Sequence, residues 1–247
     1  MEEETSAYWD GIADDRDALP PGWRRHARQE HLRLIGDWAH PSGLWLKTDL
    51  FEERSADRAL LPSLTTATWI GVDVSSAVAA QAHALVGCRS AVADVRSLPF
   101  PPARFDGVLS TSTLDHFAEE ASIDRSLREL HRVLRPGGRL LLTLDNPRNP
   151  LNRLRNALPA DWSRRTGLVP FSVGCTLDEA AGRAALMSAG FHVDATAHLL
   201  HAPHVVGTRP AHFGWYERTV LPRVESAGRT RLAPFTGHYV AFSARAT

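Results

Sequence analysis

Apolar and polar residues follow two different periods along the chain, one typical of helices and one typical of buried strands. In residues 23–39 and 123–134 the apolar positions recur every three or four residues, so each segment is predicted to be an amphipathic helix. Short apolar runs lie between and after these segments, and residues 140–144 are apolar enough for a strand buried on both faces. The segments predicted to be strands are 43–46, 67–72, 90–93, 105–110, 140–144, 191–200 and 238–244.

Strands and helices alternate in this pattern, which predicts a parallel sheet with right-handed crossovers. Helix-starting signals agree, because Ser75 and Ser76 follow the second strand and a capping box runs from Thr176 to Glu179. We therefore expect an α/β fold, a doubly wound sheet with helical N-terminal and C-terminal cover segments. Residues 1–40 are predicted to form a helical cap and 41–247 the main domain, with cover insertions at about 146–175 and 203–235.

The length and composition are those of a soluble globular protein. The chain has 247 residues, with 28 basic and 28 acidic side chains and 43% hydrophobic residues. No run approaches the roughly 18 consecutive apolar residues of a membrane helix, and the acidic start from Met1 to Glu4 is unlike a signal peptide. Cys88 and Cys175 are too few for a disulfide framework. We expect a cytoplasmic protein without a membrane segment.

Basic residues are concentrated in one stretch, residues 148–165. Five arginines lie there against a single Asp161, an excess that favours a solvated face over a nucleic-acid surface. Lys47 is the only lysine among the 28 basic residues, and such an arginine bias is typical of a GC-rich bacterial genome. The five arginines are Arg148, Arg153, Arg155, Arg164 and Arg165.

Acids and hydroxyls follow three of the predicted strands, at the edge where ligands bind in an open parallel sheet. Asp73 is placed to accept both hydroxyls of a ribose, or to cap the helix that follows it. Asp94 can accept from the amino group of adenine, or be a turn residue. Ser110 and Thr111 end the fourth strand. Each residue has an ordinary structural explanation, and only the ordered set favours a bound cofactor.

Four segments occur in the order of a known family's motifs. They are Ile70 to Ser75, the series from Ala93 through Leu98-Pro99-Phe100 to Ser110, Leu127 to Gly138, and Ala189-Gly190-Phe191. This series resembles the small-molecule branch of the class I S-adenosylmethionine-dependent methyltransferases over about residues 30–200. The resemblance implies a seven-stranded Rossmann-like fold, S-adenosylmethionine as methyl donor and S-adenosylhomocysteine as product.

The resemblance also implies roles at individual positions. Asp73 would bind the cofactor ribose, and Asp94, with the backbone amide of Val95, would read the adenine. Ser110 and Thr111 would lie beside the methionine portion and the transferable methyl group. The complete set of implied cofactor residues is Lys47, Thr48, Asp49, Asp73, Val74, Asp94, Val95, Ser110 and Thr111.

The first motif departs from the family's pattern. The family's first strand ends in an acid and a glycine-rich loop, whereas residues 46–53 contain no glycine and place Lys47 about where the acid belongs. Lys47 could pair with the methionine carboxylate while Asp49 or Glu52 takes the ammonium. Alternatively the pocket is altered and cofactor affinity is weak or absent, or Lys47 pairs with Asp49 or Glu52 and only orders the loop.

The candidate general base is His116, which follows the fourth strand and could deprotonate a hydroxyl or an amine as the methyl moves. It could instead pack beneath the cofactor. Asp115 and Asp145 are further catalytic candidates. No metal site is expected, because no cysteine or carboxylate cluster completes a shell around the C-terminal histidines. Phe213, Trp215 and Tyr216 form an aromatic cluster that could cover the pocket or, equally, pack in the core.

These observations predict methyl transfer from S-adenosylmethionine to an oxygen or nitrogen of a small molecule, in the tailoring of a natural product. Two alternatives keep the fold without the transfer: a catalyst of cyclisation or rearrangement, and a non-catalytic binding module. RNA methylation is a lesser alternative, which requires a continuous basic face over Arg148 to Arg165. The expected partner is a small-molecule substrate, and a homodimer is the candidate assembly.

Overall fold

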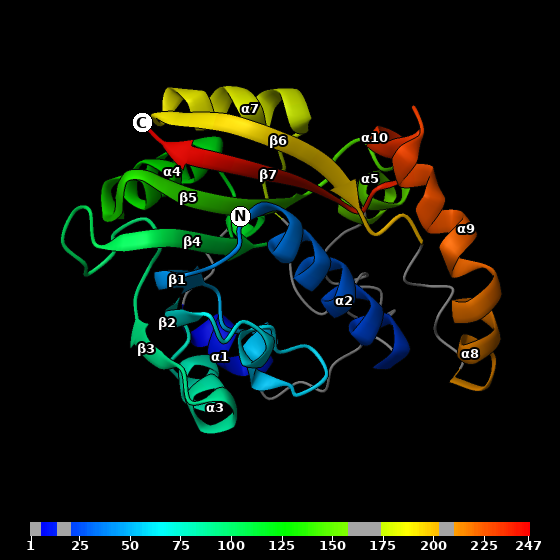
Figure 1. The fold of residues 1–247 in the computed structure, drawn as a ribbon, viewed down its shortest axis with the longest axis horizontal. Helices are drawn as coiled ribbons and strands as arrows, with labels where there is room; N and C mark the ends of the chain where they lie inside the picture. Colours follow the sequence, from blue (N-terminus) through cyan, green and yellow to red (C-terminus); the bar gives the residue numbers. More distant parts are fainter. Residues whose placement is uncertain (1–5, 14–20, 158–173, 203–209) are drawn as a thin grey trace.

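A computed structural model describes residues 6–13, 21–157, 174–202 and 210–247 (Figure 1). Within them, seven strands form one sheet in the order β3-β2-β1-β4-β5-β7-β6. Neighbouring strands from β3 to β5 are parallel, and β7 is antiparallel to both β5 and β6. The strands are β1 (Gly43–Thr48), β2 (Ala67–Asp73), β3 (Arg89–Val92), β4 (Phe105–Thr111), β5 (Leu134–Asp145), β6 (Phe191–Leu199) and β7 (Tyr239–Ala246). The predicted α/β sheet of seven strands is confirmed, but the expectation of a parallel sheet is corrected, because antiparallel β7 makes the sheet mixed.

Local sequence signals explain where several elements begin and end. The helix α3 (Ser76–Val86) starts where the hydroxyl of Ser75 accepts from the backbone amide of Val78, and it ends at Gly87 with φ of 67°. Its N-cap is the one expected from the two serines after β2. The predicted capping box from Thr176 to Glu179 is wrong in its N-cap: Asp178 caps α7 (Glu179–Ser188) by accepting from the amide of Ala181. The apolar run 140–144 lies in β5 and is buried throughout, as expected for a central strand.

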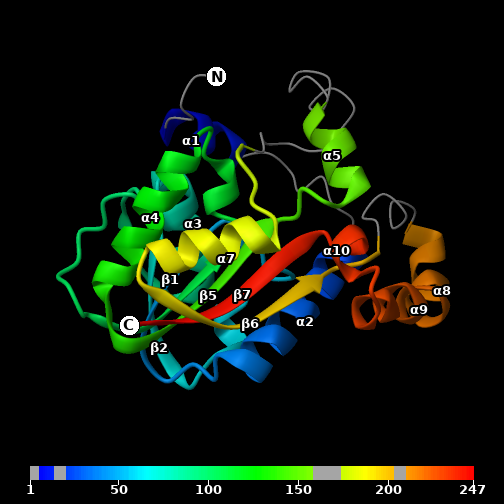
Figure 2. The same cartoon turned by 90° about the horizontal axis from the view of Figure 1, so that it is seen from above.

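Helices cover both faces of the sheet, so the fold is doubly wound. The long helix α2 (Pro21–Trp38) packs with α3 on one face, where Ile35, Trp45 and Trp69 belong to one buried cluster. On the other face α4 (Glu120–Val133) and α7 enclose a second cluster that includes Leu130 and Phe242. Figure 2 shows α4 and α7 on one side of the sheet and α2 on the other. The predicted N-terminal cap therefore contributes α2 directly to the core.

The remaining helices lie at the ends and edges of the sheet. They are α1 (Ser6–Ala13), α5 (Pro150–Ala157), α8 (Pro210–Thr219), α9 (Leu221–Glu225) and α10 (Ala233–Thr236), with 3-10 turns η1 (Glu52–Arg54), η2 (Leu61–Ser63), η3 (Leu114–His116) and η5 (Ser226–Arg229). In the described part of the chain, none of the helices combines the length and the apolar character needed to cross a bilayer. Residues 158–173 and 203–209 of the two predicted cover insertions lie outside the described residues.

The predicted aromatic cover is wrong for the two members that can be checked. Trp215 is 61% exposed, and Tyr216 is buried in the cluster under α2. Neither lines the cavity described below. The side chain of Phe213 lies outside the described residues. Helical spacing explains the error, because adjacent positions on α8 point about 100° apart and cannot share one surface.

Candidate functional site

A cavity of about 830 Å³ lies at the carboxyl ends of the parallel strands. Residues that follow β1, β2, β3 and β4 form most of its wall, as the position of ligand sites in open α/β sheets predicts. The N-terminal helix α1 adds Tyr8 and Trp9. Seven of the predicted cofactor residues line it: Thr48, Asp49, Asp73, Val74, Asp94, Val95 and Thr111. Lys47 and Ser110, the other two, do not.

Asp73 ends β2 with both carboxylate oxygens oriented by the backbone. Its Oδ2 accepts from the amide of Leu50 at 2.9 Å, and its Oδ1 accepts from the amide of Ser75 at 2.8 Å. Burial, followed by the neighbouring carboxylate of Asp49, raises the pKa of Asp73 to about 7. Each carboxylate oxygen can accept a second hydrogen bond. The fixed carboxylate is therefore suited to hold two adjacent hydroxyls, and its role at a ribose stays a prediction.

Asp94 is already engaged by its neighbour Arg96. The Arg96 Nη2 atom lies 2.6 Å from Asp94 Oδ2, and the Arg96 backbone amide donates to Oδ1 at 2.8 Å. Burial opposes the charge, but these hydrogen bonds hold the pKa of Asp94 below its ordinary value. The Arg96 guanidinium also stands 4.8 Å from the ring centroid of Phe117. Arg96 and Phe117 therefore line the same end of the cavity as Asp94, and neither was a sequence candidate.

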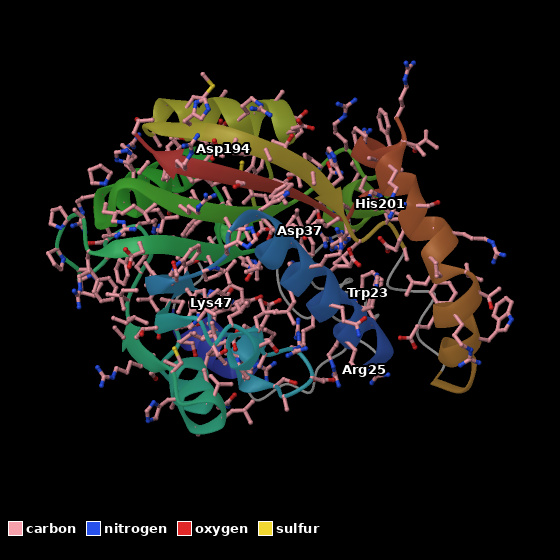
Figure 3. The ribbon with its side chains drawn as sticks, viewed as in Figure 1. Trp23, Arg25, Asp37, Lys47, Asp194 and His201 are labelled. Atoms are coloured by element: carbon pink, nitrogen blue, oxygen red, sulfur yellow. The ribbon has the colours of Figure 1, made fainter. Side chains whose placement is uncertain are left out.

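Lys47 of β1, labelled in Figure 3, is fully buried. Its ammonium donates to the backbone oxygen of Asp49 at 2.9 Å, to Thr111 Oγ1 at 3.1 Å and to Glu52 Oε2 at 3.4 Å. Burial opposes the charge, but the nearby carboxylates raise the pKa of Lys47 above its ordinary value. Three acceptors match the three N–H groups of an ammonium. The expectation that Lys47 pairs with the methionine carboxylate is therefore replaced by the alternative reading, in which Lys47 orders the loop after β1.

Ser110 lies behind the cavity rather than in its wall. It is fully buried and its hydroxyl accepts from Thr48 Oγ1 at 2.9 Å. The same Thr48 hydroxyl lies 3.0 Å from Thr113 Oγ1. This chain of hydroxyls fixes the carboxyl ends of β1 and β4 relative to each other. Ser110 thus supports the site and is corrected from a cofactor contact to a positioning residue.

His116 lies in the cavity wall, at the end of the 3-10 turn η3. The turn before it is set by Ser112, whose φ of 51° lies in the left-handed region. Such a backbone costs energy in a non-glycine residue and is concentrated at functional sites. The ring of Trp9 packs edge-to-face on His116, with centroids 4.9 Å apart. His116 is thus positioned on the cavity side of β4, where the sequence predicted a general base.

Asp115 and Asp145 belong to a buried polar network. Asp115 Oδ2 accepts from Ser112 Oγ and from the backbone amide of Asp145, both at 2.8 Å. Asp145 forms an ion pair with Arg155, and its Oδ1 lies 3.5 Å from His238 Nε2. Neither acid lines the cavity. Their expected catalytic contact is therefore corrected: both position the ends of β4 and β5.

The arginine-rich stretch after β5 has three members among the described residues, and one of them is paired with an acid. Arg155 is paired with Asp145, and its side chain is only 11% exposed. Arg148 stacks its guanidinium on Phe235, 4.6 Å from the ring centroid. Arg153 is exposed. The last two arginines, Arg164 and Arg165, lie outside the described ranges. The ion pair with Asp145 thus neutralises one of the five charges that the RNA alternative requires.

Four side chains that line the cavity were not predicted from the sequence. Tyr8, Trp9, Arg58 and Tyr239 all line it. An aromatic pair in the acidic N-terminal segment was the only local signal for Tyr8 and Trp9. Arg58 follows the glycine-free loop that the sequence analysis singled out, so an arginine close to that loop could have been considered. In the described ranges no three His, Cys, Asp or Glu side chains group as metal ligands.

Comparison with known families gives a match to part of the chain. A family described as "Methyltransferase domain" matches residues 55–142. Among curated proteins, "Probable tRNA methyltransferase 9B" of Homo sapiens is 38% identical over 56 residues, which cover 23% of this chain and 12% of that protein. The ubiquinone/menaquinone biosynthesis C-methyltransferase UbiE of Hahella chejuensis is 45% identical over 60 residues, which cover 24% and 23%.

A third relative has the longest of these matches. The fatty-acid O-methyltransferase of Mycolicibacterium smegmatis is 34% identical over 95 residues, which cover 37% of this chain and 34% of that protein. The chain thus spans only about a third or less of the length of these three relatives. Their similarity is confined to a part of each protein.

Solved structures share the fold over nearly the whole chain. The S-adenosylmethionine-dependent methyltransferase of Mesorhizobium loti superposes with a TM-score of 0.59 at 18% identity, covering 89% of this chain and 97% of that chain. The [4+2]-cyclase SpnF gives a TM-score of 0.59 at 20% identity, covering 94% and 84%. The fold is therefore shared by a methyltransferase and by a cyclase.

Proposed function

We propose that the chain is a class I S-adenosylmethionine-dependent methyltransferase and that it transfers a methyl group from S-adenosylmethionine to an oxygen or nitrogen of a small molecule. The observation that carries this proposal is the order of groups along one cavity wall. Asp94 follows β3, Asp73 ends β2 and His116 follows β4, and all three line the same cavity. Side chains that could bind a nucleoside and a candidate general base therefore lie in the same cavity.

The donor set of the cavity fits the proposed cofactor. The Asp73 carboxylate has two oriented oxygens for the ribose hydroxyls, and Asp94, Val95 and Phe117 form a polar and aromatic end for adenine. Thr111 lies in the wall at the end of β4. When bound, S-adenosylmethionine supplies an electrophilic methyl group on a sulfonium centre.

The chain's own contribution is to orient the acceptor, to exclude water and to hold its proton. His116 is the group that would accept a proton from the acceptor hydroxyl or amine. Trp9 covers His116 on one side and limits water there. Tyr239 also lines the cavity, and burial followed by the nearby carboxylates raises its pKa above its ordinary value. Tyr239 therefore stays protonated and can donate a hydrogen bond.

A small acceptor is supported by the size and closure of the cavity. Its volume of about 830 Å³ is within the range of small-molecule and cofactor sites. The helix α1 closes one side of it with Tyr8 and Trp9. The ion pair of Arg155 with Asp145 takes one of the arginine charges away from a possible RNA surface. Among small molecules, we propose a natural product as the acceptor, by analogy with the tailoring methyltransferases of bacteria with GC-rich genomes.

A cyclase or rearrangement catalyst is the second candidate, because the [4+2]-cyclase SpnF shares the fold. On that alternative the cavity would hold the cofactor without methyl transfer. The two functions differ in one observable, which is the appearance of methylated product. A non-catalytic binding module would give neither a methylated product nor a rearranged one.

The test is incubation with methyl-labelled S-adenosylmethionine and a panel of phenols, quinols, carboxylic acids and amines, with bulk RNA in a parallel reaction. We expect label in a small-molecule product together with release of S-adenosylhomocysteine. His116→Asn should lower the transfer rate by about 10²- to 10⁴-fold, while the exposed His192→Asn variant matches the wild type. Label in RNA alone would overturn the small-molecule assignment.

A further inference from the structure

The order of strands determines which part of the cofactor reaches the loop after β1. The sheet order begins β3-β2-β1-β4. With adenine at the end of β3 and ribose at Asp73 of β2, an extended cofactor next meets the end of β1. Its remaining part is the amino-acid end, which carries one ammonium and one carboxylate. This argument rests on the proposed function.

The loop after β1 presents charged side chains at that place. Residues 49–60 contain no glycine, and Asp49, Glu52 and Arg58 from this loop all line the cavity. Family members with a glycine-rich loop would bring backbone amides to the cofactor here. In this chain two carboxylates and one guanidinium occupy the wall, which is the charge pattern complementary to a zwitterion.

The two carboxylates have fixed orientations. Asp49 Oδ1 accepts from the amide of Phe51 at 2.7 Å. Glu52 Oε2 accepts from Thr111 Oγ1 at 3.1 Å and from Lys47 Nζ at 3.4 Å. Each carboxylate keeps further acceptor capacity. Buried Lys47 therefore acts by orienting Glu52.

The backbone that carries Arg58 is also held in place. The amide of Arg58 donates to the oxygen of Ser55 at 3.0 Å, and Arg28 Nε donates to the oxygen of Ala59 at 2.7 Å. The Arg58 guanidinium carbon lies 5.4 Å from the ring centroid of Phe51. Arg58 thus lies at the cavity wall on a backbone that is held in place, and its side chain ends in a planar guanidinium.

We propose that Arg58 binds the carboxylate of the cofactor's methionine portion, while Asp49 and Glu52 receive its ammonium. This arrangement replaces backbone recognition by a glycine-rich loop. Lys47 cannot take the role of Arg58, because its ammonium is enclosed by three protein acceptors and lies outside the cavity wall. An arginine, in contrast, can grip a carboxylate with two parallel hydrogen bonds.

The test compares ligands that differ only at the amino-acid end. Isothermal titration calorimetry is performed on the full chain with S-adenosylhomocysteine, with its decarboxylated form and with 5′-methylthioadenosine, which lacks both charged groups. Arg58→Gln should weaken S-adenosylhomocysteine binding about 10- to 100-fold, as expected for loss of a charged pair. The same variant should bind the other two ligands as the wild type does.

Two further variants complete the design. Asp49→Asn should weaken S-adenosylhomocysteine and its decarboxylated form alike, because both keep the ammonium, and should leave 5′-methylthioadenosine unchanged. Arg104→Gln, at an exposed arginine outside the cavity wall, is the matched control and should change nothing. Retained 5′-methylthioadenosine binding also shows that each variant is folded.

The outcomes separate this inference from the proposed function. If the wild type binds S-adenosylhomocysteine and Arg58→Gln binds it equally well, the inference is overturned and the proposed function stands. An equal loss for all three ligands also overturns it, because the effect would then not concern the carboxylate. A wild type that binds none of the three overturns the proposed function, and the inference with it.

Discussion

Trp9 packs edge-to-face on His116, with ring centroids 4.9 Å apart and planes inclined by 70°. The contact joins α1, at the start of the chain, to the turn after β4. The next residue, Asp10, attaches α1 to the start of α3. Its Oδ1 accepts from Ser75 Oγ at 2.5 Å and from the amide of Ala77 at 3.2 Å. The first turn of α3 therefore holds α1 over the candidate general base.

Removing the Trp9 ring should open this side of the cavity. Trp9→Ala is expected to weaken S-adenosylhomocysteine binding about 2- to 10-fold, which corresponds to about 0.5–1.5 kcal/mol for one aromatic contact. Trp215→Ala is the control, because Trp215 is 61% exposed and outside the cavity wall. Calorimetry on both variants measures the difference. Equal affinities for the two variants would mean that α1 does not cover the bound ligand.

Ionisation of Asp73 should control cofactor affinity near neutral pH. Its pKa is raised to about 7, so the free protein gains the carboxylate as the pH rises through that value. A carboxylate accepts from both ribose hydroxyls, whereas the neutral acid must donate its own proton. S-adenosylhomocysteine binding should therefore tighten up to about 10-fold between pH 6 and pH 8. Asp73→Asn should bind more weakly and lose this part of the pH dependence, and Asp194→Asn should keep it.

The buried pair of Lys47 and Glu52 should be a large contributor to stability. Lys47→Met leaves the Glu52 carboxylate without its cation, which is expected to lower the free energy of unfolding by about 3–5 kcal/mol. The double variant Lys47→Met/Glu52→Gln should recover part of this loss, because the carboxylate that Lys47 pairs with directly is then neutral. Arg245→Met breaks the exposed pair with Asp194 and should cost less than about 1 kcal/mol. Denaturant unfolding would contradict the account if the double variant were as unstable as Lys47→Met.

Asp115 should make the ligand-free protein less stable as the pH rises. Burial and then the neighbouring Asp145 raise the pKa of Asp115 to about 6, and its Oδ1 is a buried atom for which the described residues provide no hydrogen-bond partner. The folded state thus binds the proton more tightly than the unfolded state, and stability falls between about pH 4 and pH 6. Asp115→Asn should lack this loss and gain about 1–3 kcal/mol relative to the wild type at pH 7.5. Parallel pH profiles of unfolding would refute the assignment.

The fold could be predicted from the sequence because its signals are local. Apolar runs such as 140–144 and the serine cap at Ser75 depend on neighbouring residues, and both are found where they were expected. Likewise, Asp73 and Asp94 reach the cavity because strand ends of a parallel sheet share one edge. The strands and motif residues expected from the sequence are therefore found at the expected places in the fold.

The site could be predicted only in part, because its remaining features depend on contacts distant in sequence. Lys47 and Arg58 are both cations near the same loop, and only the burial of Lys47 against Thr111 separates their roles. The contact of Trp9 with His116 spans more than a hundred residues and has no local signal. Asp115 and Asp145 were placed at the correct strand ends, but the ion pair with Arg155 determines that they face inward.

The central claim is that the cavity holds S-adenosylmethionine, and calorimetric titration of the purified chain with S-adenosylmethionine and S-adenosylhomocysteine tests it most directly. The account predicts binding of both ligands with micromolar dissociation constants, and a loss of about 1–3 kcal/mol in Asp73→Ala, where the ribose hydroxyls lose their acceptor. The absence of binding heat for either ligand at millimolar concentration would contradict it.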